Sequence, residues 1–368
     1  MEERKAYNRI KPLVSIVVPG YNEEAIVVKN LTRICDYMAD LKKEYDWELI
    51  FINDGSRDKT GVLADEFAKD NSNVKVIHHI VNLNLGNALK TGFAHTEGDY
   101  TITMDIDLSY APWHIGNLLE TLVNTKADVV IASPYMKGGK VTAVPFIRRI
   151  MSRWVNRFMR VVAQEKLHTY TGMVRGYRTE FLKSLNLKTK DYEINPEILY
   201  KSMILRARII EIPAHLDWTG QNQQGVKRTS GIRLLQTFFS GLMAAFIFRP
   251  YIFFLSFGLI LFIVSLYIIG WIFINTFQMM PNIQVDPVYF DDKFSKTIGL
   301  VFQQRPYAFL VGGISLLAAI QILSLGFISL QNKRYFEESF HLTTSVLKKI
   351  KSKGNNVLKN SHEAKGNR

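Results

Sequence analysis

The sequence predicts an α/β protein with a mostly parallel sheet and helices on both of its faces, followed by two transmembrane helices near the C-terminus. Two observations predict this organisation. Short β-branched runs alternate with segments of helical spacing over about the first 130 residues, which is the pattern of parallel strands joined by crossover helices. Two long uncharged apolar segments then follow residue 249, and each exceeds the roughly 20 residues that a helix needs to cross a bilayer.

Turn residues and apolar spacing place the elements of the first part in order. The expected strands are 13–18, 48–52, 74–78, 100–104 and 128–132. The first helix carries apolar residues from Ile26 to Leu41, with Asn22 as its expected cap. A second helix is expected at about 58–69, and Asn84 opens a third. No Gly-x-Gly-x-x-Gly or Gly-x-x-x-x-Gly-Lys-Ser/Thr motif occurs, which disfavours a dinucleotide or P-loop site.

Two carboxylates, Asp105 and Asp107, directly follow the strand at 100–104. Ligands of an open α/β sheet bind at the carboxyl ends of its strands. Carboxylate oxygens suit Mg²⁺ or Mn²⁺, which usually bind one or two protein carboxylates together with substrate phosphates. The pair therefore indicates a nucleotide diphosphate site. An isolated Asp-x-Asp is more often a turn cap beside a solvated acid, so the decision rests on the neighbouring motifs.

The two apolar segments and the charges around them predict a membrane topology. Residues 250–284 and 307–332 carry no charge, whereas the tail after residue 332 is rich in lysine. The positive-inside rule then puts the tail and the N-terminal domain in the cytoplasm. A buried hairpin of a soluble protein is the alternative. The expected parts are a cytoplasmic domain 1–230, an interfacial helix 231–249, spans 250–277 and 307–331, an extracytoplasmic loop 278–306 and a basic tail 332–368.

The amino-acid composition indicates which kinds of molecule and which compartment the protein meets. The formal net charge is +13, which fits a protein lying on an anionic leaflet, and nucleic acid is disfavoured because no nucleic-acid motif accompanies the charge. The single cysteine, Cys35, excludes an internal disulfide and is compatible with a reducing compartment. The N-terminus lacks the apolar core of a signal peptide.

Four ordered motifs carry a family resemblance: residues 17–23 (VVPGYNE), residues 53–60 (NDGSRDKT), Asn84-x-Gly86 and Asp105-x-Asp107. In this order they resemble glycosyltransferase family 2, whose members have the Rossmann-like GT-A fold. The chain is most similar to the polyprenol-phosphate (dolichol-phosphate) sugar transferases within that family. That closer similarity rests on the two C-terminal spans and on these residues: Ser133-Pro-Tyr135, Gly138-Gly139, Pro145, Arg148 and Ser152.

The resemblance implies a role for each matching residue. It implies that Pro19, Tyr21, Glu23 and Asp54 bind the nucleoside. Asp105 and Asp107 would hold Mg²⁺ or Mn²⁺ and the diphosphate, with Asp107 catalytic. Arg148 and Ser152 would bind the acceptor phosphate and take part in catalysis. Further acceptor-phosphate candidates are Thr171, Lys227 and Arg228. The last two belong to a stretch that is similar to the basic loop closing over the diphosphate in relatives, although a basic juxtamembrane linker explains it nearly as well.

The chain departs from its relatives at several positions. Asn53 replaces the first of two acids, while Asp54, the one that would face the base, is kept. Ser109 stands where many mannosyl relatives have glutamine, and Pro134 stands where they often have arginine. His168 replaces an acid near the acceptor. A structural role is the more common one for a lone histidine.

Residues 145–163 read as a basic amphipathic helix. Arg149, Arg153 and Arg157 repeat at every fourth position, and Trp154 and Phe158 contribute apolar area. This pattern is typical of a helix at a membrane surface. A helix that packs on the core with a solvated arginine face fits the pattern equally well.

The leading interpretation is an enzyme that transfers one sugar, with inversion, from a UDP- or GDP-linked donor to a polyprenyl phosphate at the cytoplasmic face. Its product would be a lipid-phosphate sugar for later glycan or protein glycosylation. A glycolipid synthase acting on a diacylglycerol or ceramide hydroxyl and a non-catalytic membrane scaffold remain alternatives. A processive synthase is disfavoured, because two spans are too few for a translocation channel. The sugar, the base and any homo-oligomer are left open.

Overall fold

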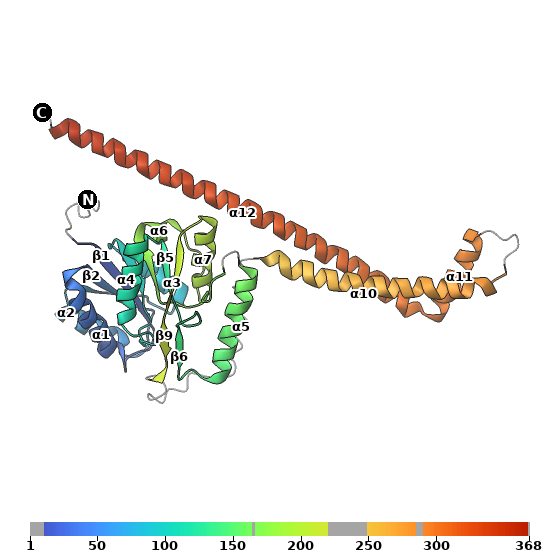
Figure 1. Cartoon of the computed structure of the whole chain (residues 1–368), viewed down its shortest axis with the longest axis horizontal. Helices are drawn as coiled ribbons and strands as arrows, with labels where there is room; N and C mark the ends of the chain where they lie inside the picture. The colour runs from blue at the N-terminus through green and yellow to red at the C-terminus, as the bar shows by residue number, and fades with distance from the viewer. Residues whose placement is uncertain (1–10, 164–165, 220–248, 285–289, 367–368) are drawn as a thin grey trace. The chain divides into compact units, whose positions relative to one another are not determined.

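The computed structural model describes residues 11–163, 166–219, 249–284 and 290–366. The chain forms two compact units, residues 1–248 with 341–368 and residues 249–340. The first unit contains the α/β sheet, and the second contains an apolar helical hairpin (Figure 1).

The main sheet has seven strands in the order β3-β2-β1-β4-β7-β5-β8. Every pairing is parallel except those of β7, which runs antiparallel to β4 and β5. All five strands expected from the sequence are present, so the prediction of a mostly parallel sheet is confirmed. The strands are β1 Leu13–Gly20, β2 Asp46–Asn53, β3 Val74–His78, β4 Tyr100–Thr103, β5 Val129–Ser133, β7 Arg175–Arg178 and β8 Ile209–Pro213. A second, two-stranded sheet pairs β6 Lys140–Thr142 with β9 His215–Asp217 in parallel.

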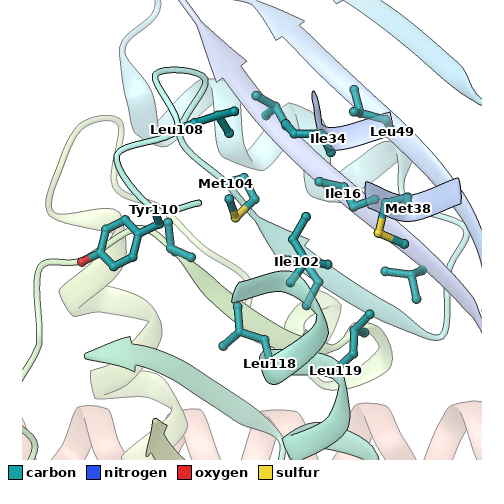
Figure 2. Packing of buried hydrophobic residues seen from close by; sticks show 14 of the residues in the cluster. Ile16, Ile34, Met38, Leu49, Ile102, Met104, Leu108, Tyr110, Leu118 and Leu119 are labelled. Carbon is teal, nitrogen blue, oxygen red and sulfur yellow. The ribbon is translucent and has the colours of Figure 1, made fainter. Parts of the chain in front are cut away.

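Helices cover both faces of the main sheet. Alternate residues of a strand point to opposite faces, and on one face Ile16 joins a core cluster with Ile34 and Leu118 (Figure 2). Those partners come from α1 Val27–Asp40 and α4 Trp113–Thr125. On the other face α3 Leu85–His95 lies so close that a β-carbon at Gly92 would stand 2.3 Å from Val17 Cγ1.

Between residues 11 and 219 the structure also describes α2 Thr60–Asp70, η2 Leu41–Lys43, α5 Phe146–Val162, α6 Thr179–Ser184 and α7 Ile194–Ile204. One sequence prediction is wrong here. Asn22 does not cap α1, which begins at Val27. Asn22 has φ +56° and its Oδ1 accepts the Arg57 N–H at 2.8 Å. The side chain that would have capped the helix is therefore occupied by a neighbouring loop.

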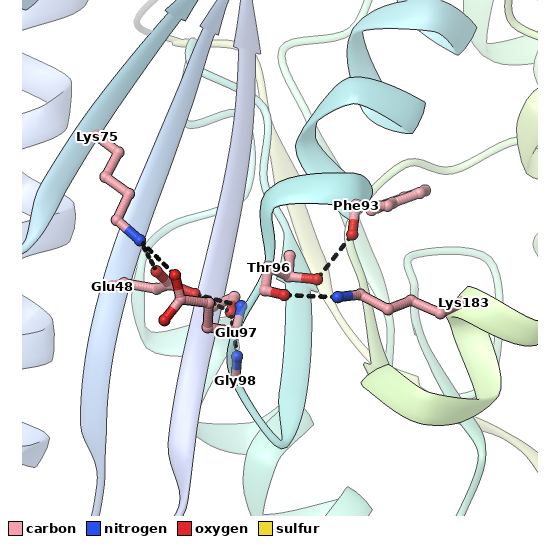
Figure 3. A network of polar contacts seen from close by, with 8 residues as sticks. Glu48, Lys75, Phe93, Thr96, Glu97, Gly98 and Lys183 are labelled. Atoms are coloured by element: carbon pink, nitrogen blue, oxygen red, sulfur yellow. Dashed lines mark hydrogen bonds and ion pairs between the residues drawn. The ribbon is translucent and has the colours of Figure 1, made fainter. Parts of the chain in front are cut away.

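A buried carboxylate fixes the amino-terminal ends of the central strands (Figure 3). Glu48 accepts hydrogen bonds from Ser15 Oγ at 2.6 Å, from Glu97 N at 2.7 Å and from Lys75 Nζ at 2.9 Å. Gly98 N in turn donates to Ser15 Oγ at 2.8 Å. These bonds anchor the turn that precedes β4. Together with the pairing of Ile16 with Ile102, they set where β4 ends and hence where the Asp105–Asp107 segment begins.

The second unit is built on two long apolar helices, each long and apolar enough to cross a membrane, at Pro250–Asn282 and Pro306–Val346. Only 11% of the most apolar window of each is buried within the described chain, unlike a core helix of a soluble protein. Ser265 Oγ donates to Gly312 O at 3.0 Å. A β-carbon at Gly258 would lie 2.9 Å from Leu323 Cγ, so small residues allow the close helix packing common in membranes. The elements are α10 Pro250–Met279, η3 Met280–Asn282, α11 Phe290–Gln304 and α12 Pro306–Gly366.

The expected division into cytoplasmic, spanning and extracytoplasmic parts stays a prediction. α11 lies within the expected loop 278–306, and α12 continues well past residue 331. Most of the expected interfacial helix 231–249 lies outside the described residues.

Candidate active site

The loops after β1 and β2 are hydrogen-bonded to each other, which brings the first two motifs together. Asp54 N donates to Gly20 O at 2.9 Å, and Glu23 N donates to Thr60 Oγ1 at 2.7 Å. Asn22 N donates to Ser56 Oγ at 2.9 Å. The four expected nucleoside-binding residues, Pro19, Tyr21, Glu23 and Asp54, therefore share one edge of the sheet. The Tyr21 ring remains 38% exposed, so it is accessible to a ligand.

The Asp54 carboxylate is buried and takes part in a network that sequence reasoning missed. Asp54 Oδ1 contacts His79 Nδ1 at 2.7 Å and accepts the Leu83 N–H at 2.9 Å. His79 Nε2 lies 2.9 Å from Thr91 Oγ1. The only sequence signal was the position of His79, immediately after an expected strand, because its partner Asp54 is 25 residues away.

Asp105 and Asp107 stand where β4 leaves the sheet. Met104 N still donates to Val17 O at 3.0 Å, and Asn30 Nδ2 holds the Ile106 carbonyl at 2.8 Å. Asp107 Oδ1 accepts the Ser109 N–H at 2.9 Å. Burial raises the pKa of Asp105, and the charge of Asp107 raises it further, whereas Arg148 opposes both effects. The two acids therefore crowd each other electrostatically.

This donor set fits a divalent cation. It consists of two hard carboxylates whose mutual repulsion a dication would relieve. Across the described ranges, no group of three or more His, Cys, Asp or Glu residues forms a metal cluster. A cation held here would complete its shell with water and with oxygens of a bound ligand, as Mg²⁺ commonly does in phosphate sites.

α5 brings the expected acceptor residues to the same place. The guanidinium of Arg148 acts on Asp105 through its charge, and Arg148 Cζ lies 4.1 Å from the centre of a Trp218 ring. Ser152, one turn further along the helix, accepts a hydrogen bond from Tyr135 OH at 2.8 Å. Asn156 Oδ1 accepts the Tyr170 N–H at 2.7 Å and so anchors the helix. The structure thus places Arg148 within electrostatic reach of Asp105, which lies 43 residues earlier in the sequence.

The outer surface of α5 combines large apolar side chains with arginines. The exposed apolar residues are Phe146, Ile147, Ile150, Trp154 and Phe158. Arg153, Arg157 and Arg160 are also exposed. A helix that packed only on the core would hide its apolar side chains, so this surface fits the membrane-surface interpretation better.

The remaining candidates are less closely tied to the acid pair. Thr171 is exposed, and its carbonyl accepts Asn195 Nδ2 at 3.5 Å. The main-chain N–H of His168 donates to Glu211 at 2.8 Å, and its Nδ1 contacts the same carboxylate at 2.8 Å. His168 therefore holds a turn against β8. Lys227 and Arg228 lie outside the described residues.

A further feature of the site is the loop before α7. A β-carbon at Gly86 would lie 2.5 Å from the Lys190 carbonyl carbon, so only glycine permits this approach. Buried Glu197 accepts the N–H groups of Lys188 and Thr189, both at 2.9 Å, and fixes the loop. Burial, and then the charges of Glu193 and Asp54, raise the pKa of Asp191, although a hydrogen bond from Tyr192 N opposes them. This loop therefore borders the Asp54 end of the site.

Comparison with known proteins agrees with these motifs. Residues 15–185 match the family model "Glycosyl transferase family 2". The chain is 31% identical over 203 residues to a dolichol-phosphate mannosyltransferase of Pyrococcus furiosus, covering 54% of this chain and 55% of that protein. It is 28% identical over 234 residues to a polyprenol monophosphomannose synthase of Mycolicibacterium smegmatis, covering 61% of this chain and 83% of that protein. The first match thus spans little more than half of the relative's length.

Among solved structures, the chain is similar to glucosyl-3-phosphoglycerate synthase from Mycobacterium tuberculosis, crystallised with Mn²⁺, UDP and phosphoglyceric acid. The identity is 19% and the TM-score 0.43, with 59% of this chain and 71% of that chain covered.

Proposed function

We propose that this chain, in which residues 15–185 form a glycosyl transferase family 2 domain, is an enzyme that transfers one sugar from a nucleotide diphosphate donor to a polyprenyl phosphate. The reaction proceeds with inversion at the cytoplasmic face of a membrane. The observation that carries the proposal is that the charge of Arg148 acts on Asp105, because this puts a phosphate-binding cation within electrostatic reach of a diphosphate site.

The donor occupies the edge formed by the ends of β1, β2 and β4. Pro19, Tyr21, Glu23 and Asp54 bind its nucleoside. Asp105 and Asp107 hold Mg²⁺ or Mn²⁺, which when bound supplies positive charge for the departing diphosphate. An oxygen of the acceptor phosphate forms a bond to the anomeric carbon while the bond from that carbon to the diphosphate oxygen breaks. The nucleoside diphosphate leaves from the opposite face, so the configuration inverts.

A phosphate acceptor suits the groups around Arg148. A phosphate monoester has a second pKa of about 6, so near neutral pH it is largely a dianion and needs no general base. Arg148 can donate charge-assisted hydrogen bonds to it, and Ser152 adds a hydroxyl one turn away. Exposed Trp154 and Phe158 on the same helix suit contact with lipid. The two apolar helices would keep the enzyme in the membrane that carries the isoprenoid.

The residues around the site suit a hydroxyl acceptor less well, because a hydroxyl would need a general base with a pKa near the working pH. Asp217 is the acid whose backbone bonds to the Asp105–Ser109 loop, through its N–H to Ser109 O at 2.8 Å. The side-chain and main-chain hydrogen bonds of Thr219 lower the pKa of Asp217, which weakens it as a base. His168 is held by Glu211 instead. These contacts favour the phosphate over a diacylglycerol or ceramide hydroxyl.

The relatives support the same choice of acceptor. One is named a dolichol-phosphate mannosyltransferase, one a polyprenol monophosphomannose synthase and one, from Shewanella sediminis, an undecaprenyl-phosphate 4-deoxy-4-formamido-L-arabinose transferase. Their sugars differ while their lipid phosphate is shared. We therefore propose the acceptor class and leave the sugar open.

The test is transfer by the purified full-length chain. Radiolabelled nucleotide sugars are supplied with undecaprenyl or dolichyl phosphate and, separately, with diacylglycerol, in Mn²⁺ or Mg²⁺. We expect an acid-labile lipid product from the polyprenyl phosphate. Product from diacylglycerol alone would make the chain a glycolipid synthase. Folded protein that neither binds nucleotide nor transfers sugar would make it a non-catalytic scaffold.

A further inference from the structure

The two oxygens of the Asp54 carboxylate differ in the contacts that they make. Oδ1 receives both the His79 Nδ1 contact at 2.7 Å and the Leu83 N–H at 2.9 Å. Both side chains are nearly buried, at 6% exposure for Asp54 and 8% for His79. No hydrogen bond joins Oδ2 to any residue of the described chain. Within the described chain, Asp54 is therefore held through Oδ1, and Oδ2 keeps its acceptor sites.

The network holds both ring nitrogens of His79. An ionised carboxylate only accepts hydrogen bonds, so His79 donates through Nδ1. His79 Nε2 lies 2.9 Å from Thr91 Oγ1, so the second ring nitrogen is held as well. The His79 main-chain N–H donates to Asn53 O at 2.9 Å, which fixes the backbone that carries the ring. Each carboxylate oxygen has about two acceptor sites, and both sites of Oδ1 are filled.

Uracil and guanine, the two common bases of sugar nucleotides, present different hydrogen-bond donors to such a carboxylate. Uracil offers a single ring N–H between two carbonyls, which one oxygen can accept. Guanine offers a ring N–H beside an exocyclic amino group. These parallel donors match both oxygens of a free carboxylate, in the manner of an arginine fork. With Oδ1 filled, one guanine donor would be left without its partner, and unpaired buried donors are costly.

We propose that the donor is a uridine nucleotide sugar and that His79 sets this choice by occupying Asp54 Oδ1. The inference rests on the proposed function, in which Asp54 binds the base. His79 acts as a positioning residue through Asp54 and need not touch the nucleotide. The replacement of a neighbouring acid by Asn53 is in keeping with this, because it leaves Asp54 as the one carboxylate at that pair of positions.

The experiment measures the affinities of UDP and GDP for the full-length protein in detergent with Mn²⁺, by titration calorimetry. UDP is expected to bind about tenfold more tightly than GDP, the worth of roughly one hydrogen bond. Equal affinities, or tighter binding of GDP, would overturn the inference while leaving the proposed function standing. Binding of neither would remove the proposed function and this inference together.

Two variants test the role of His79. His79→Leu frees one site on Oδ1, so the ratio of the GDP to the UDP dissociation constant should fall at least about threefold. His79→Asn keeps an amide donor near the Nδ1 position and should retain the wild-type ratio. An unchanged ratio in folded His79→Leu would refute the role of His79. If His79→Leu does not fold, the wild-type titrations still decide the base.

The neighbouring histidine provides a matched control. His78 lies on β3, where its ring contacts Asn53 Nδ2 at 3.0 Å and Asp65 Oδ1 at 3.0 Å. His78→Leu should therefore leave the ratio unchanged. An equal fall in this variant would show a general effect of loosening the strand end and would count against His79.

Discussion

At the scale of single residues, the site depends on two neighbouring acids whose charges act on each other. Burial and the nearby Asp107 raise the pKa of Asp105. Asp107 is partly exposed and already accepts the Ser109 N–H at 2.9 Å. Asp105 and Asp107 are both half-buried, and the main-chain partner of Asp107 is one that an amide oxygen could keep.

Asp107→Asn should leave the fold intact, since the amide oxygen can still accept the Ser109 N–H. Transfer should fall at least about a hundredfold, because the leaving diphosphate would lose a neutralising cation worth several kcal/mol. Sugar transfer and circular dichroism measure the two effects. Asp70→Asn, an exposed change at the end of α2, is the control and should be silent. Full activity of the wild type in EDTA would contradict the metal assignment.

Arg148→Ala separates acceptor binding from donor binding. Transfer to polyprenyl phosphate should fall at least about tenfold, because one charge-assisted contact is lost. The affinity for nucleoside diphosphate, measured by calorimetry, should remain. Arg153→Ala removes an exposed arginine of the same helix and should cost much less. Equal losses from both variants would mean that the whole basic surface, rather than Arg148, binds the phosphate.

At the scale of elements, the loop before α7 shows how a buried acid shapes the site. Glu197 accepts two main-chain N–H groups at 2.9 Å and pairs with Lys201 Nζ at 2.7 Å. Burial opposes its ionisation, but Lys201, Thr189 and the Lys188 N–H more than compensate, so the pKa of Glu197 lies below 4.5. The loop that Glu197 holds is the one against which Gly86 packs.

Glu197→Gln should lower the stability of the fold by about 3 kcal/mol at neutral pH, since it removes the carboxylate that balances the buried charge of Lys201, whose Nζ also donates to Asn186 O at 2.6 Å. Because the folded pKa lies below the ordinary 4.5, the stabilisation is complete above that pH and is lost as the pH falls through the folded pKa. The melting temperature of the wild type should therefore drop more steeply below pH 4.5 than that of the variant. Parallel curves, or the same effect from exposed Glu180→Gln, would contradict this account.

At the scale of the whole molecule, the two apolar helices and the basic tail predict an orientation. Both termini should be cytoplasmic, with the segment around Asn282 on the other side. The only native cysteine barely interferes with thiol labelling, because burial, with the charge of Asp36, raises the pKa of Cys35 to about 11. An introduced cysteine therefore reports on its own position.

Asn282→Cys should react with a membrane-impermeant maleimide added to intact cells, and Ser361→Cys should react only after the membrane is opened. Both variants should retain sugar transfer, which checks that they are folded. The reverse labelling pattern would invert the topology and rule out a cytoplasmic donor site.

The sequence by itself determined the features whose causes are local. Alternating β-branched runs gave five strands, and the position of Asp105 and Asp107 directly after one of them placed the acid pair at the edge of the sheet. Length and lack of charge identified the two apolar helices. Apolar spacing also predicted helix α5, but it did not predict which side chains of that helix would be exposed. Each of these depends on neighbours within one or two turns of the chain.

Only the tertiary structure decided the contacts that join distant segments. It inserted antiparallel β7 between β4 and β5, set His79 against Asp54, brought Arg148 to Asp105 and closed the loop held by Glu197 over Gly86. It also gave Asn22 a partner in another loop, Arg57, in place of the helix it was expected to cap. Sequence spacing carries no signal for such pairs, because they form when the packed sheet brings strand ends together, and the energy of each depends on burial that no local pattern reveals.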